Sequence, residues 1–377
     1  MCRIFDLAFE STTPIWQVPT RAVKGSEFGI EPDQEVAMSS TIKQVRVHGP
    51  GAVSLDHVEL PECGPRDAVV ELRACGICGS DLGYIRLGGV AGPGPDPMPL
   101  GHEMSGVITS VGSEVTDLRP GQRVVVHPGR DDIGRIGNGS PEGGLADAVL
   151  VRDAAAGDRL FPIPDDMPFE IAALAEPVAV GMHAVDQADP APDDAVAVFG
   201  CGPIGLAAIT TLAGRGIERI VGIEPSATRR RLAEALGARA TIDPTTDDVW
   251  KQLRQLHGTT PTMSGDTAAT TGFIEASGAG KVLSDIIANA GRGSRISVVA
   301  VHYAPVEVNF LHVLTNELTI RGSIEYPPRF RDAIDLLERR DLTPLISHRF
   351  PLESIDDALN TLKQDRECGK ILIEMNR

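Results

Sequence analysis

The sequence predicts an α/β protein made of two domains, one rich in short β-strands and one built on a doubly wound parallel sheet. Three observations lead to this prediction. The chain has 377 residues, more than a single hydrophobic core of ordinary size accommodates. Between residues 41 and 164, short apolar runs are separated by glycine and proline, as in a compact β-rich domain. After Pro192 strands and helices alternate, which is typical of a parallel sheet with right-handed crossovers.

The first domain is predicted to begin with a strand at residues 41–47. Further strands are predicted at 53–60, 68–74, 104–111, 123–127 and 146–151. A helix follows at 168–185, and its apolar residues are too dense for a surface helix. In the second domain, strands are predicted at 195–199, 219–223, 240–242, 273–276 and 295–301, and helices at 203–213, 227–236, 247–256 and 281–290. The polar residues 258–272 are predicted to form an exposed loop.

The last part of the chain is predicted to return to the first domain. It contains a strand at 318–322, helices at 329–339 and 355–363, and a final strand at 370–374. A final strand needs the edge of an existing sheet to join. We therefore expect the C-terminal residues to complete the β-rich domain.

The composition limits the classes of function. The 52 acidic against 35 basic residues give a net charge of −17, which repels phosphate backbones, so we expect no nucleic-acid partner. No apolar run approaches the roughly 20 residues needed to span a bilayer, so we expect no membrane contact. Residues 1–40 are predicted to be an N-terminal extension without the pattern of a secretion signal. The six cysteines do not suggest a disulfide framework, which favours the cytoplasm.

A glycine-rich turn opens the first helix of the second domain. Its residues are Gly200, Cys201, Gly202, Pro203, Ile204 and Gly205. The turn follows a strand within a β-α-β unit, the context in which this pattern binds the diphosphate of a dinucleotide. Gly200 is predicted to allow the tight turn, Gly202 to let the backbone approach the diphosphate, and Gly205 to bring helix against strand. A tight turn that binds nothing is the alternative.

An acidic residue at the end of the next strand predicts which dinucleotide binds. Glu224 can accept hydrogen bonds from the adenosine ribose hydroxyls and would repel a 2′-phosphate, which favours NAD over NADP. Arg229 and Arg230 follow a few residues later. A guanidinium can bind such a phosphate, so NADP remains the alternative. The predicted cofactor-binding residues are the glycine-rich turn, Glu224 and Arg229.

Side chains of the first domain predict a zinc site. Cys78 follows a strand, and His102 and Glu103 begin another. A thiolate, an imidazole and a carboxylate are ligands that a catalytic zinc ion uses when it keeps a coordination position open. Asp81 is expected to hold His102 by its other ring nitrogen. Cys75 forms a C-x-x-C with Cys78; we interpret Cys75 as a buried strand residue, with a redox pair as the alternative.

One further carboxylate is a candidate ligand. Glu176 lies among apolar residues of a predicted helix, where burying an unpaired charge would be costly. A metal ion would supply a partner. A salt bridge at the helix end is the alternative.

These motifs, in this order, resemble the zinc-dependent medium-chain dehydrogenase/reductase (alcohol dehydrogenase) family, and within it the polyol, butanediol and threonine dehydrogenases. The resemblance covers residues 41–377 and includes Gly-Gly-Leu-Ala at 143–146 and Gly-Lys-Ile-Leu at 369–372. It implies a GroES-like catalytic domain in two pieces, 41–190 and 326–377, and a Rossmann NAD-binding domain, 191–325. It also implies a cleft at their junction and a homodimer or homotetramer.

The resemblance assigns roles to the candidate residues. It makes Cys78, His102 and Glu103 zinc ligands, and Glu176 a fourth ligand or the partner of a zinc-bound water. Ser80 becomes the hydroxyl that takes the substrate proton. The implied reaction transfers hydride between a secondary alcohol, diol or polyol and NAD, giving a ketone or aldehyde, because zinc lowers the pKa of the alcohol. The alternatives are an NADPH-dependent carbonyl reductase and a catalytically silent nucleotide-binding protein on the same scaffold.

Three departures from the family refine these expectations. Many relatives have four cysteines around a structural zinc ion, whereas residues 129–142 contain none, so we expect one zinc per chain. Relatives often have a histidine where this chain has Gly83, so the proton is expected to pass from Ser80 through a cofactor ribose hydroxyl or water. Sorbitol-type enzymes have an arginine where this chain has Glu325, before Tyr326. That difference argues against sorbitol and for a smaller diol, a hydroxyketone or an amine-bearing polyol.

Overall fold

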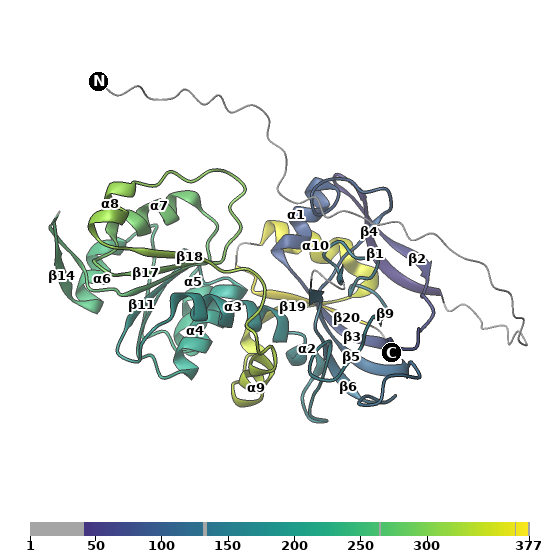
Figure 1. Ribbon diagram of the computed structural model, residues 1–377. Coiled ribbons are helices and arrows are strands. Elements are labelled where there is room, and N and C mark those ends of the chain that lie inside the picture. The colour runs from purple at the N-terminus through teal and green to yellow at the C-terminus, as the bar shows by residue number, and fades with distance from the viewer. Residues whose placement is uncertain (1–40, 131–133, 264, 366, 376–377) are drawn as a thin grey trace, which may run out of the picture. The chain divides into compact units, whose positions relative to one another are not determined.

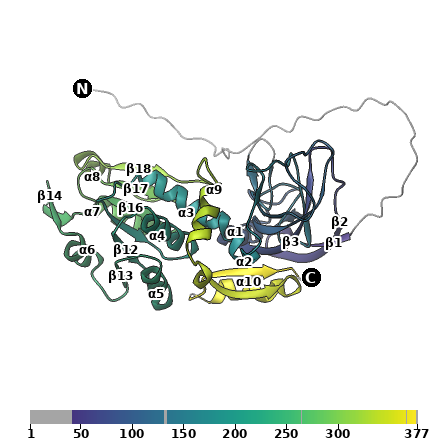
Figure 2. The same cartoon turned by 90° about the horizontal axis from the view of Figure 1, so that it is seen from below.

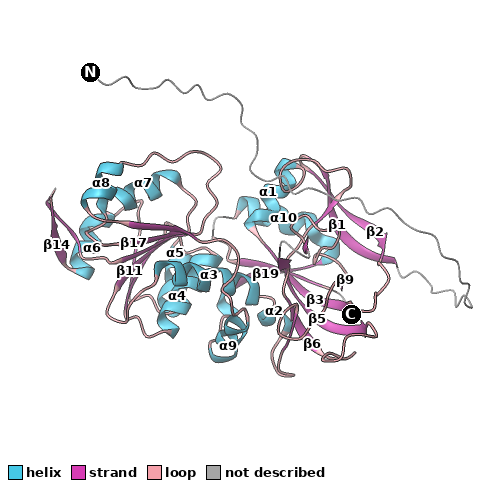
Figure 3. Cartoon of the chain, in the orientation of Figure 1, coloured by secondary structure: helices cyan, strands magenta, loops and turns pink. Residues whose placement is uncertain are grey.

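The computed structural model describes residues 41–130, 134–263, 265–365 and 367–375 (Figure 1). The predicted N-terminal extension, residues 1–40, lies outside the described residues. Among the described residues, no helix is both long and apolar enough to cross a membrane. The helices and strands are distinguished by colour in Figure 3.

Segments from both ends of the described chain form the β-rich part. Its strands are β1 (Thr41–Gly49), β2 (Ala52–Glu59), β3 (Ala68–Ile77), β4 (Met98–Pro99), β5 (Glu103–Val111), β6 (Arg123–Val126), β7 (Gly129–Arg130), β8 (Gly134–Arg135), β9 (Ala148–Val151), β10 (Leu160–Pro162), β19 (Ile346–Pro351) and β20 (Lys370–Glu374). The largest sheet has the order β10-β6-β5-β3-β20-β19, with β9 also paired to β3. Strands β2-β1-β4 form a second sheet, and β7 pairs with β8.

The pairing around β3 determines where the site lies. The last strand, β20, runs antiparallel to β3, with Ile371 opposite Ile77. On the other side of β3, strand β5 places Glu103 opposite Gly76. One core buries alternate side chains of the two strands, Val70 and Leu72 of β3 and Ile371 and Ile373 of β20, and a shift of one residue would turn them to the other face. The end of β3 therefore meets the starts of β5 and β20.

The middle of the chain forms a six-stranded sheet in which every pair is parallel. Its strands are β11 (Ala195–Phe199), β12 (Arg219–Ile223), β13 (Ala240–Ile242), β16 (Gly272–Glu275), β17 (Arg295–Val298) and β18 (Thr319–Gly322). Their order is β13-β12-β11-β16-β17-β18. This sheet confirms the predicted doubly wound arrangement.

Helices cover both faces of the parallel sheet. The helices of the chain are α1 (Gly79–Leu87), α2 (Phe169–Ala172), α3 (Ala175–Ala188), α4 (Pro203–Gly214), α5 (Ala227–Ala235), α6 (Val249–His257), α7 (Gly280–Asn289), α8 (Phe310–Thr315), α9 (Arg331–Arg339) and α10 (Ile355–Gln364), with short 3-10 turns at Thr343–Leu345 and Leu352–Ser354. In β11, Val196 and Val198 pack with α3 and α4, whereas Ala197 and Phe199 pack with α6 and α7. Alternate side chains thus meet opposite layers, as β-geometry requires; helices α3, α4, α6 and α7 are labelled in Figure 2.

Two predicted segments differ from the structure. The polar residues 258–272 are not a simple loop, because β14 (Thr259–Thr262) and β15 (Gly265–Ala268) form a hairpin within them. The threonines that made the segment look polar are β-branched and favour extended backbone. The predicted helix 168–185 is two helices, α2 and α3. The second begins at Ala175 and places Glu176 in its first turn.

His257, at the end of α6, gives a prediction about stability. Its ring is buried and Nδ1 lies 2.8 Å from Thr270 Oγ1. Burial, helped by the charge of Arg219, lowers the pKa of His257 from 6.5 to about 4. Below pH 6.5 the His257 side chain of the unfolded chain is protonated, whereas in the folded chain it stays neutral down to about pH 4. Folding stability should therefore fall as the pH is lowered through this window, by up to about 1.4 kcal/mol per pH unit.

Urea unfolding at pH 7 and pH 5 measures this dependence, with His257→Gln as the comparison. The wild type should lose more stability than the variant between the two pH values. Equal losses would contradict the assignment of a neutral, buried His257.

Candidate metal centre and cofactor site

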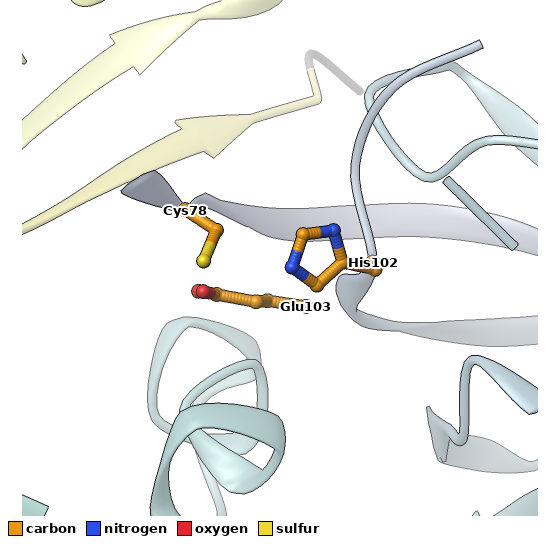
Figure 4. A group of neighbouring side chains, drawn as sticks. All are labelled: Cys78, His102 and Glu103. Atoms are coloured by element: carbon orange, nitrogen blue, oxygen red, sulfur yellow. The ribbon is translucent and has the colours of Figure 1, made fainter. Parts of the chain in front are cut away.

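Cys78, His102 and Glu103 come together where β3 and β5 meet. One ligand atom from each residue lies within 4.8 Å of the other two, and Figure 4 shows the three side chains facing the same space. Cys78 is the N-cap of α1, and its backbone N–H donates to Asp81 Oδ2 at 2.8 Å. Its sulfur atom, the metal-binding atom of a cysteine, is thus placed at the start of α1.

Cys75, the other thiol of the C-x-x-C, is fully buried in β3. Burial raises the pKa of the Cys75 thiol, and the nearby carboxylates of Glu103 and Asp81 raise it further. Both Cys75 and Cys78 are free thiols. These features agree with a packing role for Cys75 and not with a redox pair.

A glycine makes room for the Glu103 side chain. Gly76 lies opposite Glu103 in the β3–β5 pair. A Cβ atom on Gly76 would lie 1.8 Å from Glu103 Oε2, so any larger residue would displace the carboxylate. Gly76 therefore shapes the site, although the sequence reasoning did not single it out.

A buried lysine holds the other oxygen of Glu103. Lys370 Nζ donates to Glu103 Oε1 at 2.6 Å and to the carbonyl oxygen of Ile77 at 3.2 Å. Both side chains of the ion pair are almost completely buried. The sequence did not lead us to predict this ion pair. The one feature that points to it is a lysine at the start of the largely apolar strand β20.

The remaining polar atoms of the group fit a cation. Glu103 Oε2 is buried and has no hydrogen-bond partner among the described residues. His102 Nδ1 lies 3.7 Å from Asp81 Oδ1, longer than a hydrogen bond but on the side predicted for Asp81, which leaves Nε2 for a metal. Burial opposes protonation of His102, yet Asp81 and Cys78 outweigh it and raise the pKa of His102 well above its usual value. The surroundings thus attract positive charge, as a zinc site requires.

Glu176 is close enough to His102 and Glu103 to feel their charges, but its hydrogen-bond partner is the phenol of Tyr326. Its Oε1 accepts a hydrogen bond from the Tyr326 hydroxyl at 2.8 Å. Burial raises the pKa of Glu176 to about 7, and Glu103 adds to the shift, whereas His102 opposes it. The Tyr326 ring packs edge-on against His127, with 4.8 Å between ring centroids. Tyr326 thus orients Glu176, and direct contact of Glu176 with a metal ion stays a prediction.

Ser80 lies half-buried in the first turn of α1. One turn later, Gly83 faces Tyr303, because a Cβ atom on Gly83 would lie 2.7 Å from the Tyr303 hydroxyl oxygen. The Arg86 guanidinium carbon lies 4.9 Å from the centre of the Tyr303 ring. The space that a side chain at position 83 would occupy is therefore taken by Tyr303.

Glu325, the residue that departs from the sorbitol-type pattern, is not a free anion. Its carboxylate forms an ion pair with Arg135 of β8. Its backbone has a φ of +65°, in the left-handed region that non-glycine residues seldom adopt. The predicted pairing of Glu325 with a substrate amine therefore loses support, because Arg135 already provides a positive partner.

The glycine-rich turn has the geometry that its pattern predicts. Gly200 has a φ of +90°, and a Cβ atom on Gly205 would lie 1.9 Å from the Gly200 carbonyl oxygen. Gly202 caps α4, which begins with Pro203 and Ile204. A pocket of about 410 Å³ adjoins the turn; its lining includes Gly200, Gly202, Glu224, Arg229, Trp250 and Ser277. A helix N-terminus beside this pocket suits a diphosphate.

Glu224 lies at the end of β12 with its carboxylate fixed by backbone groups. Oε2 accepts from the N–H of Cys201 at 2.8 Å, and Oε1 accepts from the N–H of Ser226 at 3.0 Å. A carboxylate has about four acceptor positions, so ribose hydroxyls can still donate to it. Arg229 Nη1 lies 3.9 Å from Oε1, and the rest of its guanidinium donates to the Cys368 carbonyl oxygen.

Sequence comparison with known proteins finds similarity in both parts of the chain. Residues 64–165 match the family model described as alcohol dehydrogenase GroES-like domain, and residues 203–339 match the one described as zinc-binding dehydrogenase. The chain is 31% identical to sorbitol dehydrogenase of Rattus norvegicus, over 84% of this chain and 92% of that protein. It is 30% identical to (R,R)-butanediol dehydrogenase of Bacillus subtilis (strain 168), over 89% of this chain and 100% of that protein.

Solved structures agree with this similarity. The crystal structure of 2R,3R-butanediol dehydrogenase from Bacillus subtilis aligns with a TM-score of 0.77 at 28% identity, over 89% of this chain and 100% of that chain. Galactitol-1-phosphate dehydrogenase from Escherichia coli aligns with a TM-score of 0.75 at 28% identity, over 88% and 99%. The predicted α/β fold with a GroES-like part and a Rossmann-type sheet is thereby confirmed, and the chain belongs to the zinc-dependent medium-chain dehydrogenase family.

Proposed function

We propose that the chain is a zinc-dependent oxidoreductase that transfers hydride between NAD and a secondary alcohol of a vicinal diol or polyol. The observation that carries this proposal is the buried group Cys78, His102 and Glu103, with one Glu103 oxygen left without a hydrogen-bond partner among the described residues. The similarity to dehydrogenases of sorbitol, butanediol and galactitol 1-phosphate supports a substrate of this class.

We assign each residue of the site a separate role in metal binding, proton transfer or positioning. Cys78, His102 and Glu103 would hold one zinc ion per chain, with Glu176 as a fourth ligand or as the partner of a water molecule. Bound zinc supplies a Lewis acid that lowers the pKa of a hydroxyl group. Ser80 would accept the substrate proton, and Tyr326 would keep the Glu176 carboxylate oriented.

The cofactor site favours NAD, which accepts the hydride when bound. Glu224 would accept hydrogen bonds from the adenosine ribose and repel a 2′-phosphate. Both nearby arginines are already engaged: Arg229 with the Cys368 carbonyl, and Arg230 Nη1 with the Glu224 and Pro225 carbonyls at 2.7 Å each. Steady-state rates with NAD and NADP compare the two cofactors. A higher kcat/KM for NADP would favour the alternative, an NADPH-dependent carbonyl reductase.

The substrate itself is tested by a panel of vicinal diols, polyols, hydroxyketones and amine-bearing polyols. NADH formation, followed by absorbance, reports oxidation, and NADH consumption reports reduction of the hydroxyketones. We expect a small vicinal diol to be oxidised, whereas amine-bearing polyols gain no advantage because Glu325 is paired with Arg135. A protein that binds NAD but turns over no member of the panel would support the catalytically silent alternative.

The proton path from Ser80 gives a further prediction. No imidazole is available at position 83, so added imidazole should raise the oxidation rate by acting as a soluble base. The Tyr303 hydroxyl fills the space beside Gly83, so Tyr303→Ala should enlarge the imidazole effect. Rates that stay constant with imidazole in both proteins would show that Ser80 needs no such relay.

We also infer a homodimer or homotetramer that works in the cytoplasm. Several apolar side chains are exposed between residues 301 and 324, namely Val301, Tyr303, Phe310, Leu311, Leu314, Ile320 and Ile324. The same segment includes β18, at the edge of the parallel sheet. Exposed apolar groups beside an open strand edge are typical of an interface. Light scattering should give a mass of two or four chains; the free thiols of the described cysteines support a reducing compartment.

A further inference from the structure

A set of contacts joins the start of α5 to the segment that precedes β20. The Glu367 carboxylate accepts a hydrogen bond from the Ser226 hydroxyl at 2.7 Å and from the backbone N–H of Thr228 at 3.2 Å. The Cys368 carbonyl oxygen accepts from Arg229 Nε at 3.1 Å and from Arg229 Nη2 at 2.7 Å. We call these five residues the clasp.

The clasp is built on the electrostatics of a helix terminus. Ser226 is the N-cap of α5, and its side chain accepts from the N–H of Arg229. No acidic residue of α5 itself lies in the first turn of the helix. Glu367, from a distant part of the chain, therefore supplies the negative charge that a helix N-terminus favours. The hydrogen bonds to Ser226 and Thr228 also lower the pKa of Glu367, so the carboxylate stays ionised.

One end of the clasp adjoins the cofactor site. Glu224 directly follows β12 and lies two residues before Ser226. Its Oε1 accepts a hydrogen bond from the N–H of Ser226 at 3.0 Å. Arg229 lines the same pocket as Glu224. A ribose that is hydrogen-bonded to Glu224 would therefore hold Ser226 at the start of α5 in place. Ser226 in turn donates a hydrogen bond to Glu367.

The other end adjoins the metal centre. Lys370, two residues after Cys368, donates to Glu103 Oε1 at 2.6 Å. Gly369, the residue between them, packs closely against the segment 345–347: its N–H donates to Ser347 Oγ at 2.9 Å, and a Cβ atom would lie 2.4 Å from the Leu345 carbonyl oxygen. Because only this residue separates Cys368 from Lys370, the position of residues 367 and 368 bears on the position of Lys370.

We propose that the clasp couples the two sites, so that NAD bound at Glu224 holds Lys370 against Glu103 and slows the loss of the metal ion. Ser226 and Glu367 are positioning residues in this account, because they act through Lys370 and Glu103. The inference rests on the proposed function, since it needs both a zinc ion and NAD. Coupling between two sites is reciprocal at equilibrium, so the factor by which NAD raises the affinity for zinc is also the factor by which zinc should raise the affinity for NAD.

The test is the rate of zinc release from the full-length holoenzyme to excess chelator, with and without saturating NAD. In the wild type we expect NAD to slow release about tenfold, within the usual range of coupling between sites. In Glu367→Ala and Ser226→Ala the effect of NAD should be reduced to about twofold or less. Asp357→Asn, which changes an exposed acid in the first turn of α10, is the matched control and should keep the tenfold effect.

Several outcomes would overturn the proposal. One is that NAD slows release equally in the wild type and both clasp variants, and another is that NAD has no effect on release from the wild type. A lower melting temperature in the variants with an unchanged NAD effect would mean that the clasp only stabilises the fold. Failure of the proposed function is distinguished by measuring zinc content and NAD binding of the wild type first. A wild type that takes up no zinc, or binds no NAD, contradicts the proposed function and not the clasp.

Discussion

Replacing Cys78 by alanine is expected to abolish alcohol-dependent NAD reduction while leaving NAD binding close to that of the wild type. The change removes the one thiolate of the predicted zinc ligands, and metal assistance supplies several kcal/mol of transition-state stabilisation, which corresponds to a loss of about 10³-fold or more. The glycine-rich turn and Glu224 belong to the parallel sheet and its helices, so the cofactor pocket should stay intact. Initial rates and calorimetric titration with NAD measure the two effects.

Cys75→Ala is the matched control for this prediction. Cys75 lies three positions earlier, is fully buried, and forms the other half of the C-x-x-C. We expect the variant to keep its zinc and most of its activity, with a modest loss of stability. Activity that survives in Cys78→Ala would refute the zinc mechanism, and equal losses in both variants would revive the redox alternative.

Replacing Lys370 by methionine is expected to destabilise the protein by about 3–5 kcal/mol, because it leaves the buried Glu103 carboxylate without its cation. The lysine side chain is 3% and the glutamate side chain 1% exposed, so water cannot substitute for the lost partner. Metal affinity should fall about 10- to 100-fold, as for other groups that orient a ligand. Urea unfolding of zinc-free protein measures the first effect, and chelator competition the second.

Lys43→Met provides the comparison. Lys43 forms an ion pair with Glu353 in which both side chains are exposed, and such pairs contribute little to stability. A shift of the urea midpoint that is equally small in both variants would contradict a structural role for the Lys370–Glu103 pair. A large shift in stability without a change in metal affinity would mean that Lys370 supports the fold but does not position Glu103.

The grouping of the candidate zinc ligands and the nucleotide motif could be predicted because their signals are local. Cys78 follows a strand whose pattern is visible, His102 and Glu103 begin another, and the glycine-rich turn lies between a strand and a helix. The partners of these residues could not be predicted, because they come from distant segments. Lys370 is 267 positions from Glu103, and Tyr326 is 150 positions from Glu176. Only the pairing of β20 with β3 brings the lysine to the site.

The fold class could be predicted for a similar reason, because alternating strands and helices after Pro192 leave few arrangements other than a parallel sheet. The polarity of a segment was a poor guide to its secondary structure where the branching of its side chains favours extended backbone. Residues 259–268 look like a polar loop, but their threonines form a hairpin. Glu325 was expected to be able to pair with an amine-bearing polyol, and only the position of β8 shows that it forms an ion pair with Arg135.

The central claim, a single catalytic zinc ion held by Cys78, His102 and Glu103, is tested most directly by titrating zinc-free protein with zinc. The rate of NADH formation from a vicinal diol is measured against the zinc content found by elemental analysis. Because the three ligands form one group and residues 129–142 contain no cysteine, the rate should rise from near zero and level off at one zinc ion per chain. A rate that does not depend on zinc content, or a plateau at two ions per chain, would contradict this account.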